Sequence, residues 1–126
     1  MLPSGWAFRI APMEHGENSK VFLVYMTTPT QEEALTLARE LVRMRLAAGV
    51  NIVPGAQSVY RWKGEVHEAG ECLLVAQVSE AALPDFMAKA RALHSYEVPC
   101  VVAMPIADGH QPFLRWITEN SLPPTA

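Results

Sequence analysis

The fold is decided first by residues 21–42, VFLVYMTTPTQEEALTLARELV, which pass from one hydrophobic period to another. Residues 21–26 are a short, continuous apolar run with β-branched and aromatic side chains, which is typical of a buried strand. Apolar side chains then recur at helical spacing up to Val42. Thr30 and Glu33 have the spacing of a capping box, in which the hydroxyl accepts the Glu33 amide and the carboxylate reaches back. This stretch therefore predicts a strand followed by a helix.

The next part of the chain predicts an antiparallel hairpin. Gly49 follows the helical pattern, and we expect it to supply the left-handed position after the helix. Residues 50–53 begin a second strand, which residues 54–55, Pro-Gly, interrupt. The alternation of apolar and polar side chains then continues through Gly64 without a change of phase. We therefore place Gly64 inside a strand and the hairpin turn at residues 68–70, Glu-Ala-Gly.

The second half of the chain predicts two more strands and two more helices. Residues 72–76 return as an apolar strand, and Pro84 fits the first turn of a helix. Residues 100–106 form the last strand, where Pro105 fits an edge position because it has no amide to donate. Pro112 can begin a short final helix. The apolar side chains expected to face inward are Phe86, Met87, Ala90 and Leu93 in the first of these helices and Phe113, Trp116 and Ile117 in the second.

The predicted order is βαββαβ with an additional C-terminal helix. This order is typical of an α+β ferredoxin-like sandwich, in which strands one and three are central. We expect one domain over residues 20–120, preceded by a flexible extension at residues 1–19 and followed by a tail at residues 121–126. The strands with the most continuous apolar runs occupy the two predicted central positions.

The apolar strands also predict self-association. A sheet with helices on one face and water on the other alternates between apolar and polar side chains. Residues 21–26, 72–76 and 100–106 do not alternate, so both faces of the sheet need cover. Monomers rarely expose apolar patches beyond roughly 300–600 Å². A three-turn terminal helix is too small to cover a sheet; the alternative is that the long hairpin folds back over its own sheet.

Composition and charge exclude several classes of function. The chain has 126 residues, 10 Lys and Arg against 13 Asp and Glu, and a formal net charge of −3, without the basic stripe of a nucleic-acid-binding protein. We find no run that fits a signal peptide or a membrane span. Cys72 and Cys100 do not form a disulfide framework, which favours a reduced, cytoplasmic setting. No phosphate-binding loop or nucleophile elbow is present, so we expect a protein that is not an enzyme.

Three motifs in this chain resemble one family. RLAAGVNIVPG at residues 45–55, YRWKGEV at residues 60–66 and HSYEVP at residues 94–99 strongly resemble the CutA family of divalent-cation-tolerance proteins. The resemblance extends over roughly residues 20–120, in consistent order and spacing. It implies a ferredoxin-like subunit, a homotrimer with facing sheets, and a link to copper and other divalent cations.

The sequence departs from the family pattern at three positions outside its first strand. Gly49 stands where many members have a cysteine. Ser95 stands where the loop commonly has a proline, as His-Pro-Tyr-Glu. Gln77 stands where a lysine is frequent near the end of the third strand.

The resemblance also implies a reduced copper site. Some bacterial members have a cysteine at the end of the first strand, linked to copper together with histidines of the loop; here that position is Met26, and Leu93 precedes His94. The implied metal ligands are therefore His94 and Met26, since imidazole suits copper, zinc and nickel and a thioether suits Cu(I). Two ligands need others from neighbouring subunits. Alternatively, His94 only caps the end of a helix.

A second group of candidate residues consists of three aromatic side chains and one carboxylate. Aromatic rings with a polar tip favour boundaries where one end is dry and the other finds a hydrogen-bond partner. These residues act either as anchors between subunits or as the lining of an intersubunit cleft for a small ligand. They are Tyr60, Trp62, Tyr96 and Glu97.

The sequence and the resemblance together predict a cytoplasmic homotrimer that requires no cofactor and binds copper or other divalent metal ions. The alternative is a PII-like signalling or scaffold trimer with a small ligand in the intersubunit cleft. We expect neither nucleic acid nor a membrane as a partner.

Overall fold

The structure is a computed structural model that describes residues 20–123, so the extension predicted at residues 1–19 lies outside it. Its elements follow the predicted order of strands and helices. No helix in the described part of the chain is long and apolar enough to cross a membrane. The elements are β1 (Val21–Thr28), α2 (Gln31–Arg43), β2 (Gly49–Trp62), β3 (Glu65–Ser79), α3 (Leu83–Leu93), β4 (Val101–Pro105) and α4 (Gln111–Asn120).

The four strands form one antiparallel sheet in the order β2-β3-β1-β4. The central strands are β1 and β3, as their apolar runs predicted. Strand β4 lies at an edge and ends at Pro105, opposite Phe22 of β1. Pro105 has no backbone N–H to donate, and at this edge position the sheet loses no hydrogen bond because of it.

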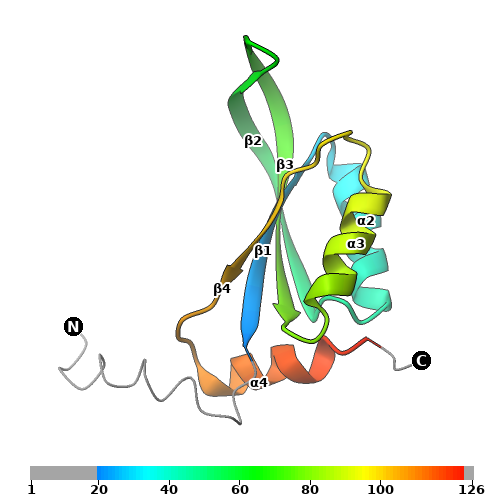
Figure 1. Cartoon of the computed structure of the whole chain (residues 1–126), viewed down its shortest axis with the longest axis vertical. Coiled ribbons are helices and arrows are strands. Elements are labelled where there is room, and N and C mark those ends of the chain that lie inside the picture. Colours follow the sequence, from blue (N-terminus) through cyan, green and yellow to red (C-terminus); the bar gives the residue numbers. More distant parts are fainter. Residues whose placement is uncertain (1–19, 124–126) are drawn as a thin grey trace, which may run out of the picture.

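Helices α2 and α3 pack side by side on one face of the sheet (Figure 1). The core lies between these helices and the inward side chains of the strands. Thr30 caps α2 as predicted, because its hydroxyl accepts the Glu33 amide at 3.1 Å. Side chains without exposed surface in this core include Val24, Met26, Leu41, Leu74, Val78 and Phe86.

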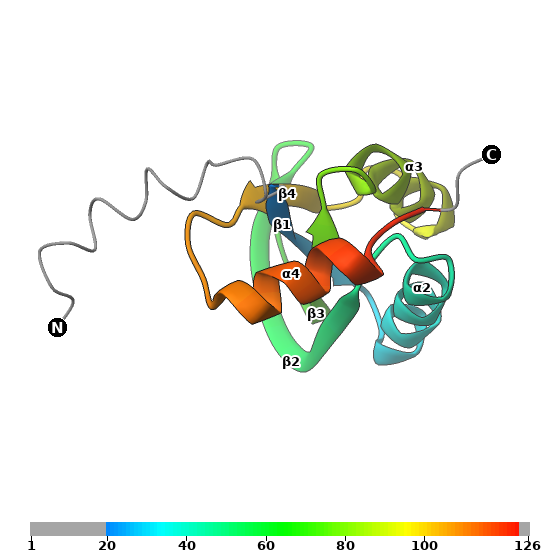
Figure 2. The same cartoon turned by 90° about the horizontal axis from the view of Figure 1, so that it is seen from below.

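Helix α4 lies across the foot of the sheet, at the end opposite the hairpin tip (Figures 1 and 2). Ile117 is its fully buried anchor. The predicted inward faces of the helices are wrong at three side chains, which remain 39–48% exposed. These are Leu93, the last residue of α3, and Phe113 and Trp116 of α4, which lies only across the foot of the sheet.

Strands β2 and β3 extend well beyond the other strands. Strand β1 pairs only with residues 72–79 of β3. Residues 56–71, from the pair Ala56–Glu71 to the turn, therefore form a two-stranded arm that projects from the sheet (Figure 1).

The predicted hairpin turn is wrong. The turn lies at Lys63-Gly64, between the paired residues Trp62 and Glu65, and both of its residues have positive φ, 52° and 82°. Positive φ at both central residues is the geometry that matches the twist of two strands. The alternation misled because both faces of the arm are largely exposed, so its apolar positions do not mark a core.

Two other glycine assignments also differ from the prediction. The left-handed position after α2 is Arg45, with φ 63°, and Gly49 instead begins β2. A Cβ at position 49 would lie 2.8 Å from the Gln77 Oε1 atom, so a larger residue there would require the end of the Gln77 side chain to move. Residues 54–55 do not interrupt the second strand; they form a bulge in β2, where Gly55 has φ 86°.

The face of the sheet opposite α2 and α3 is apolar, as predicted. The register places Tyr25 of β1 between Val75 of β3 and Val102 of β4. Tyr25, Val102 and Met104 are exposed, and α4 lies only across the foot of the sheet. Within residues 20–123, most of this face therefore has no cover.

Candidate functional site

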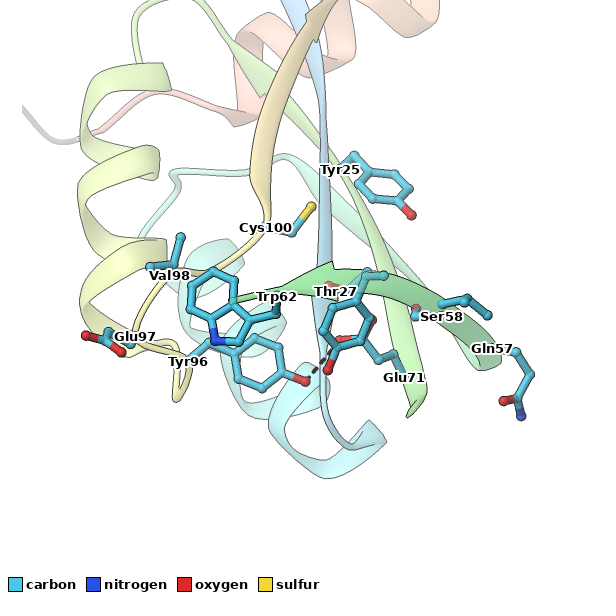
Figure 3. A pocket seen from close by; sticks show the side chains of 12 residues that line it. Tyr25, Thr27, Gln57, Ser58, Trp62, Glu71, Tyr96, Glu97, Val98 and Cys100 are labelled. Atoms are coloured by element: carbon cyan, nitrogen blue, oxygen red, sulfur yellow. Dashed lines mark hydrogen bonds between the residues drawn. The ribbon is translucent and has the colours of Figure 1, made fainter. Parts of the chain in front are cut away.

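A cleft of about 650 Å³ lies where the arm leaves the sheet. The end of β1, both strands of the arm and the loop between α3 and β4 contribute to it (Figure 3). It brings together Tyr60, Trp62, Tyr96 and Glu97, the second group of residues predicted from the sequence. The lining residues are Tyr25, Thr27, Gln57, Ser58, Val59, Tyr60, Trp62, Glu71, Tyr96, Glu97, Val98 and Cys100.

Four aromatic rings line this cleft. Tyr25 comes from β1, Tyr60 and Trp62 come from β2, and Tyr96 comes from the loop. Each residue keeps between 36% and 44% of its surface exposed. The rings are therefore held by the fold and are still accessible to a ligand or to a second protein surface.

A hydrogen bond closes one side of the cleft. The Tyr96 phenol donates to the Glu71 carboxylate at 2.9 Å, and Figure 3 shows the hydroxyl directed at that group. Burial, and then the neighbouring Glu71, raise the pKa of the Tyr96 phenol to about 12. The phenol is therefore neutral at physiological pH and acts as a fixed donor.

The cleft has an acidic lining. Glu71 and Glu97 are its carboxylates, and no Lys, Arg or His is among its lining residues. In Figure 3 the Glu97 carboxylate points away from Glu71. Opposite charge lowers the energy of a cation here, and a concave surface with one sign of charge concentrates its field.

Cys100 adds a thiol to this acidic lining. Cys72 is buried in the core, whereas Cys100 is exposed. Partial burial, and then the charge of Glu71, raise the pKa of the Cys100 thiol above its ordinary value. The group is therefore a neutral thiol until something displaces its proton.

His94 connects two segments of the cleft wall. Its ring is fully buried, and the residue is the C-cap of α3. The Nε2–H group donates to the Thr27 carbonyl at 2.7 Å, and Nδ1 accepts the Tyr96 amide at 3.0 Å. Since the carbonyl only accepts and the amide only donates, these partners fix the neutral Nε2–H tautomer.

Ser95 fastens the same loop to helix α2. Its amide and its hydroxyl both donate to the Glu33 carboxylate, at 3.0 and 2.8 Å. The carboxylate that the capping box predicted for its own helix end therefore binds the loop instead. A proline at position 95 would have neither donor, so the departure from the His-Pro-Tyr-Glu pattern has a structural use here.

The predicted metal ligands are both buried. Met26 belongs to the core, without exposed surface, and both nitrogens of His94 already have hydrogen-bond partners. Within the described residues, no group of three or more His, Cys, Asp or Glu side chains is arranged to hold a metal ion. Met26 and His94 as metal ligands stay a prediction, which requires His94 to release one partner.

Sequence reasoning missed Glu71 and Cys100 as residues of the cleft. With the turn placed at residues 68–70, Glu71 lay between that turn and the returning strand predicted at residues 72–76. The observed register puts Glu71 opposite Ala56, at the base of the arm. A Lys-Gly pair between two strands was the signal that could have placed the turn correctly.

The comparisons with known proteins match this fold and these motifs. The family model described as "CutA1 divalent ion tolerance protein" matches residues 22–120. The chain belongs to the CutA1 family. This membership confirms the resemblance found in the three sequence motifs.

Individual CutA1 relatives are similar over most of the described chain. The divalent-cation tolerance protein CutA of Thermus thermophilus is 48% identical over 99 residues, which cover 79% of this chain and 96% of that protein. The chloroplastic CutA of Arabidopsis thaliana is 39% identical over 108 residues, 83% of this chain. This match spans only 59% of the Arabidopsis protein, so that relative is considerably longer.

Solved CutA1 structures have the same fold. The Thermus thermophilus structure aligns with a TM-score of 0.78 over 80% of this chain and 98% of its own, at 48% identity. The Oryza sativa structure aligns with a TM-score of 0.80 over 84% and 97%, at 37% identity. Relatives are described as chloroplastic or, in Archaeoglobus fulgidus, as periplasmic, so membership of the CutA1 family does not determine the compartment.

Proposed function

We propose that this chain is a non-catalytic, cytoplasmic CutA1 protein that binds copper or other divalent metal ions as a homotrimer and contributes to metal tolerance. One observation carries the proposal. The cleft has two carboxylates and a thiol in its lining and no basic side chain among its lining residues. Such a lining favours a cation over an anionic ligand such as a nucleotide.

The uncovered surfaces support the trimer. A two-stranded hairpin is marginally stable on its own in water, yet the arm pairs with no third strand of the described chain. Tyr60 and Trp62 expose rings on the arm, and the open face of the sheet is apolar. Other copies of the chain would cover both surfaces, with ferredoxin-like subunits packed sheet against sheet.

The trimer also bears on the metal ligands. Glu71 and Cys100 would provide one carboxylate and one thiolate, and a stable site needs three or four ligands. A neighbouring copy would provide the remainder, or His94 and Met26 would act instead. Because the Cys100 thiol has a raised pKa, metal binding must release its proton, and uptake is expected to increase with pH.

Native mass spectrometry of metal-free protein tests this proposal, before and after addition of Cu(II), or of Cu(I) with a reductant. We expect a trimer with near-integral copper per subunit. Loss of copper from Glu71→Gln and Cys100→Ser assigns the metal to the cleft. Loss from His94→Ala or Met26→Ala alone assigns it to the pair implied by the resemblance. A trimer that takes up no copper contradicts the metal proposal, and a monomer contradicts the assembly.

One observation favours a second function. Four aromatic rings line the cleft, and a metal ion does not need them. A PII-like signalling or scaffold trimer with a small ligand would use them. With this second function, the protein would be insensitive to chelators, and its response to the ligand would change on substitution of Trp62 or Glu97.

A further inference from the structure

The aromatic lining of the cleft has its own chemistry. Aromatic faces are negative and attract cations that lie within about 6 Å of the ring centre, Trp most strongly. Trp62, Tyr60, Tyr96 and Tyr25 reach the cleft from three different segments of the chain. An arrangement of several rings around one space recognises alkylated ammonium groups, whose charge is spread over their methyl groups.

The chain already places an ammonium group over one of these rings. The Lys63 Nζ atom lies 5.7 Å from the centre of the Trp62 ring. Lys63 belongs to the turn of the arm and is not among the lining residues of the cleft. Trp62 therefore accepts a cation within its own chain, which is an observation independent of the cleft.

The polar groups of the cleft complete a cation site. Glu71 Oε2 accepts the Tyr96 hydroxyl, which leaves the Oε1 atom free of that bond. Tyr96 adds no negative charge, and no basic lining residue neutralises Glu71. One carboxylate thus remains beside the rings, held in place by a hydrogen bond.

The volume of the cleft suits an organic cation better than a bare metal ion. Its volume of about 650 Å³ is in the range of pockets for small molecules, roughly 300–1,000 Å³. A metal ion needs several ligand atoms within about 2–2.5 Å. The described residues offer no cluster of three such side chains.

We propose that this cleft binds a small organic cation with an alkylated ammonium group, with its methyl groups against Trp62 and Tyr60 and its charge facing Glu71. This site shares the cleft of the proposed metal function but does not depend on metal binding. It requires the cleft side of Tyr60 and Trp62 to stay accessible in the assembly, so it competes with their role as anchors between subunits. For the alternative function, in which the cleft holds a small ligand, the proposal names one chemical class of ligand.

Isothermal titration calorimetry on the full chain, treated with EDTA, tests the charge requirement. The probes are choline and 3,3-dimethylbutan-1-ol, which has the same shape without the charge. We expect choline to bind at least about tenfold more tightly than the neutral alcohol, a difference of about 1.4 kcal/mol. Equal affinities, or no choline binding at millimolar concentrations, would overturn the proposal.

Variants test the position of the site. Trp62→Leu keeps an apolar side chain and removes the ring, and Glu71→Gln keeps the shape and removes the charge; each is expected to weaken choline binding at least tenfold. Phe113→Leu is the matched control, because Phe113 is an equally exposed ring on α4, outside the cleft. If Trp62→Leu fails to fold or to assemble, Tyr60→Leu replaces it. Unchanged affinity in these cleft variants would overturn the proposal.

Two further outcomes distinguish binding of an organic cation from metal binding and from filling of the cleft by a second copy. Choline binding without copper uptake supports it and contradicts the metal function, whereas copper uptake without choline binding does the reverse. Choline binding that is detected only after the assembly is dissociated means that a side chain of a second copy fills the cleft. That result would also overturn the small-molecule proposal.

Discussion

At the scale of single residues, Tyr96 is the most strongly perturbed group of the cleft. Its phenol donates to Glu71, and its pKa of about 12 lies above the ordinary value of 10.0. A pKa that is raised in the folded state adds stability below the unfolded value, which is lost as pH rises through the folded value. Stability is therefore expected to fall between about pH 10 and 12.

Ultraviolet titration of the three tyrosines checks this prediction. We expect Tyr96 to ionise near pH 12 in the parent protein and at lower pH in Glu71→Gln, because the carboxylate accepts a hydrogen bond from the neutral phenol and repels a phenolate. Tyr96→Phe identifies the signal. If Glu71→Gln leaves the titration unchanged, Glu71 does not contribute to the shift, and burial remains as its main cause.

His94 is the second residue whose partners predict a measurable effect. His94→Leu leaves two backbone groups, the Thr27 carbonyl and the Tyr96 amide, without the imidazole nitrogens that are their hydrogen-bond partners. Each buried polar group left unpaired costs about 1–3 kcal/mol, so for two groups we expect the free energy of unfolding to fall by roughly 2–6 kcal/mol.

Urea unfolding measures this change, and hydrogen exchange should show faster exchange of the Tyr96 amide. His110→Leu is the matched control, since His110 is exposed and its side chain does not cap α4. Equal stability of the two variants would mean that His94 does not hold the loop.

At the scale of elements, the position of the hairpin turn gives a sharp test. Gly64 has φ 82°, which strains any residue with a Cβ, whereas Gly70 lies in β3 with open space around its Cβ position. We expect Gly64→Ala to destabilise the arm by about 1–2 kcal/mol. Gly70→Ala should be neutral or slightly stabilising.

Hydrogen exchange of the arm amides and thermal unfolding compare these two glycine variants. The turn that the sequence analysis placed at residues 68–70 would give the opposite order. A larger loss in Gly70→Ala than in Gly64→Ala would therefore favour that placement over the observed one.

The elements also show which sequence patterns were informative. Strand β1 was predicted from its continuous apolar run and α2 from its helical period, because burial in the core imposes both patterns. The arm has no core of its own in the described chain. Its apolar side chains therefore follow no burial pattern, and the phase of Tyr60 and Val66 could not be determined from the sequence.

At the scale of the whole molecule, the apolar second face followed from the sequence. The four predicted residues line one cleft of the single chain, and their place between subunits stays a prediction. Tyr60, Trp62, Tyr96 and Glu97 came from motifs that lie far apart along the chain. Glu71 could not be placed with them, because its position depends on the register of β2 against β3. A register is a property of paired strands, and one wrong turn shifts every pair beyond it.

The proposed trimer predicts the effect of Trp62→Ala on assembly. Trp62 is exposed in the single chain and would be buried between copies. Truncation of a buried aromatic residue costs about 3–5 kcal/mol, so the loss should appear as a lower melting temperature that depends on protein concentration.

Native mass and melting curves at several concentrations test this effect. Phe113→Ala is the control, because Phe113 lies on α4, away from the arm. An unchanged mass together with melting that does not depend on concentration would remove Trp62 as an anchor between subunits.

The strand order has a consequence for how the molecule is made. Strand β1 leaves the ribosome before the other three strands of the sheet, but its two neighbours are residues 72–79 and 101–105. The apolar centre of the sheet therefore waits, with both edges open, until most of the chain has been synthesised. The β2–β3 hairpin closes locally, through a two-residue turn, and can form before β1 is enclosed. During synthesis β1 is thus an apolar strand without either of its partners, which is the kind of segment that chaperones protect.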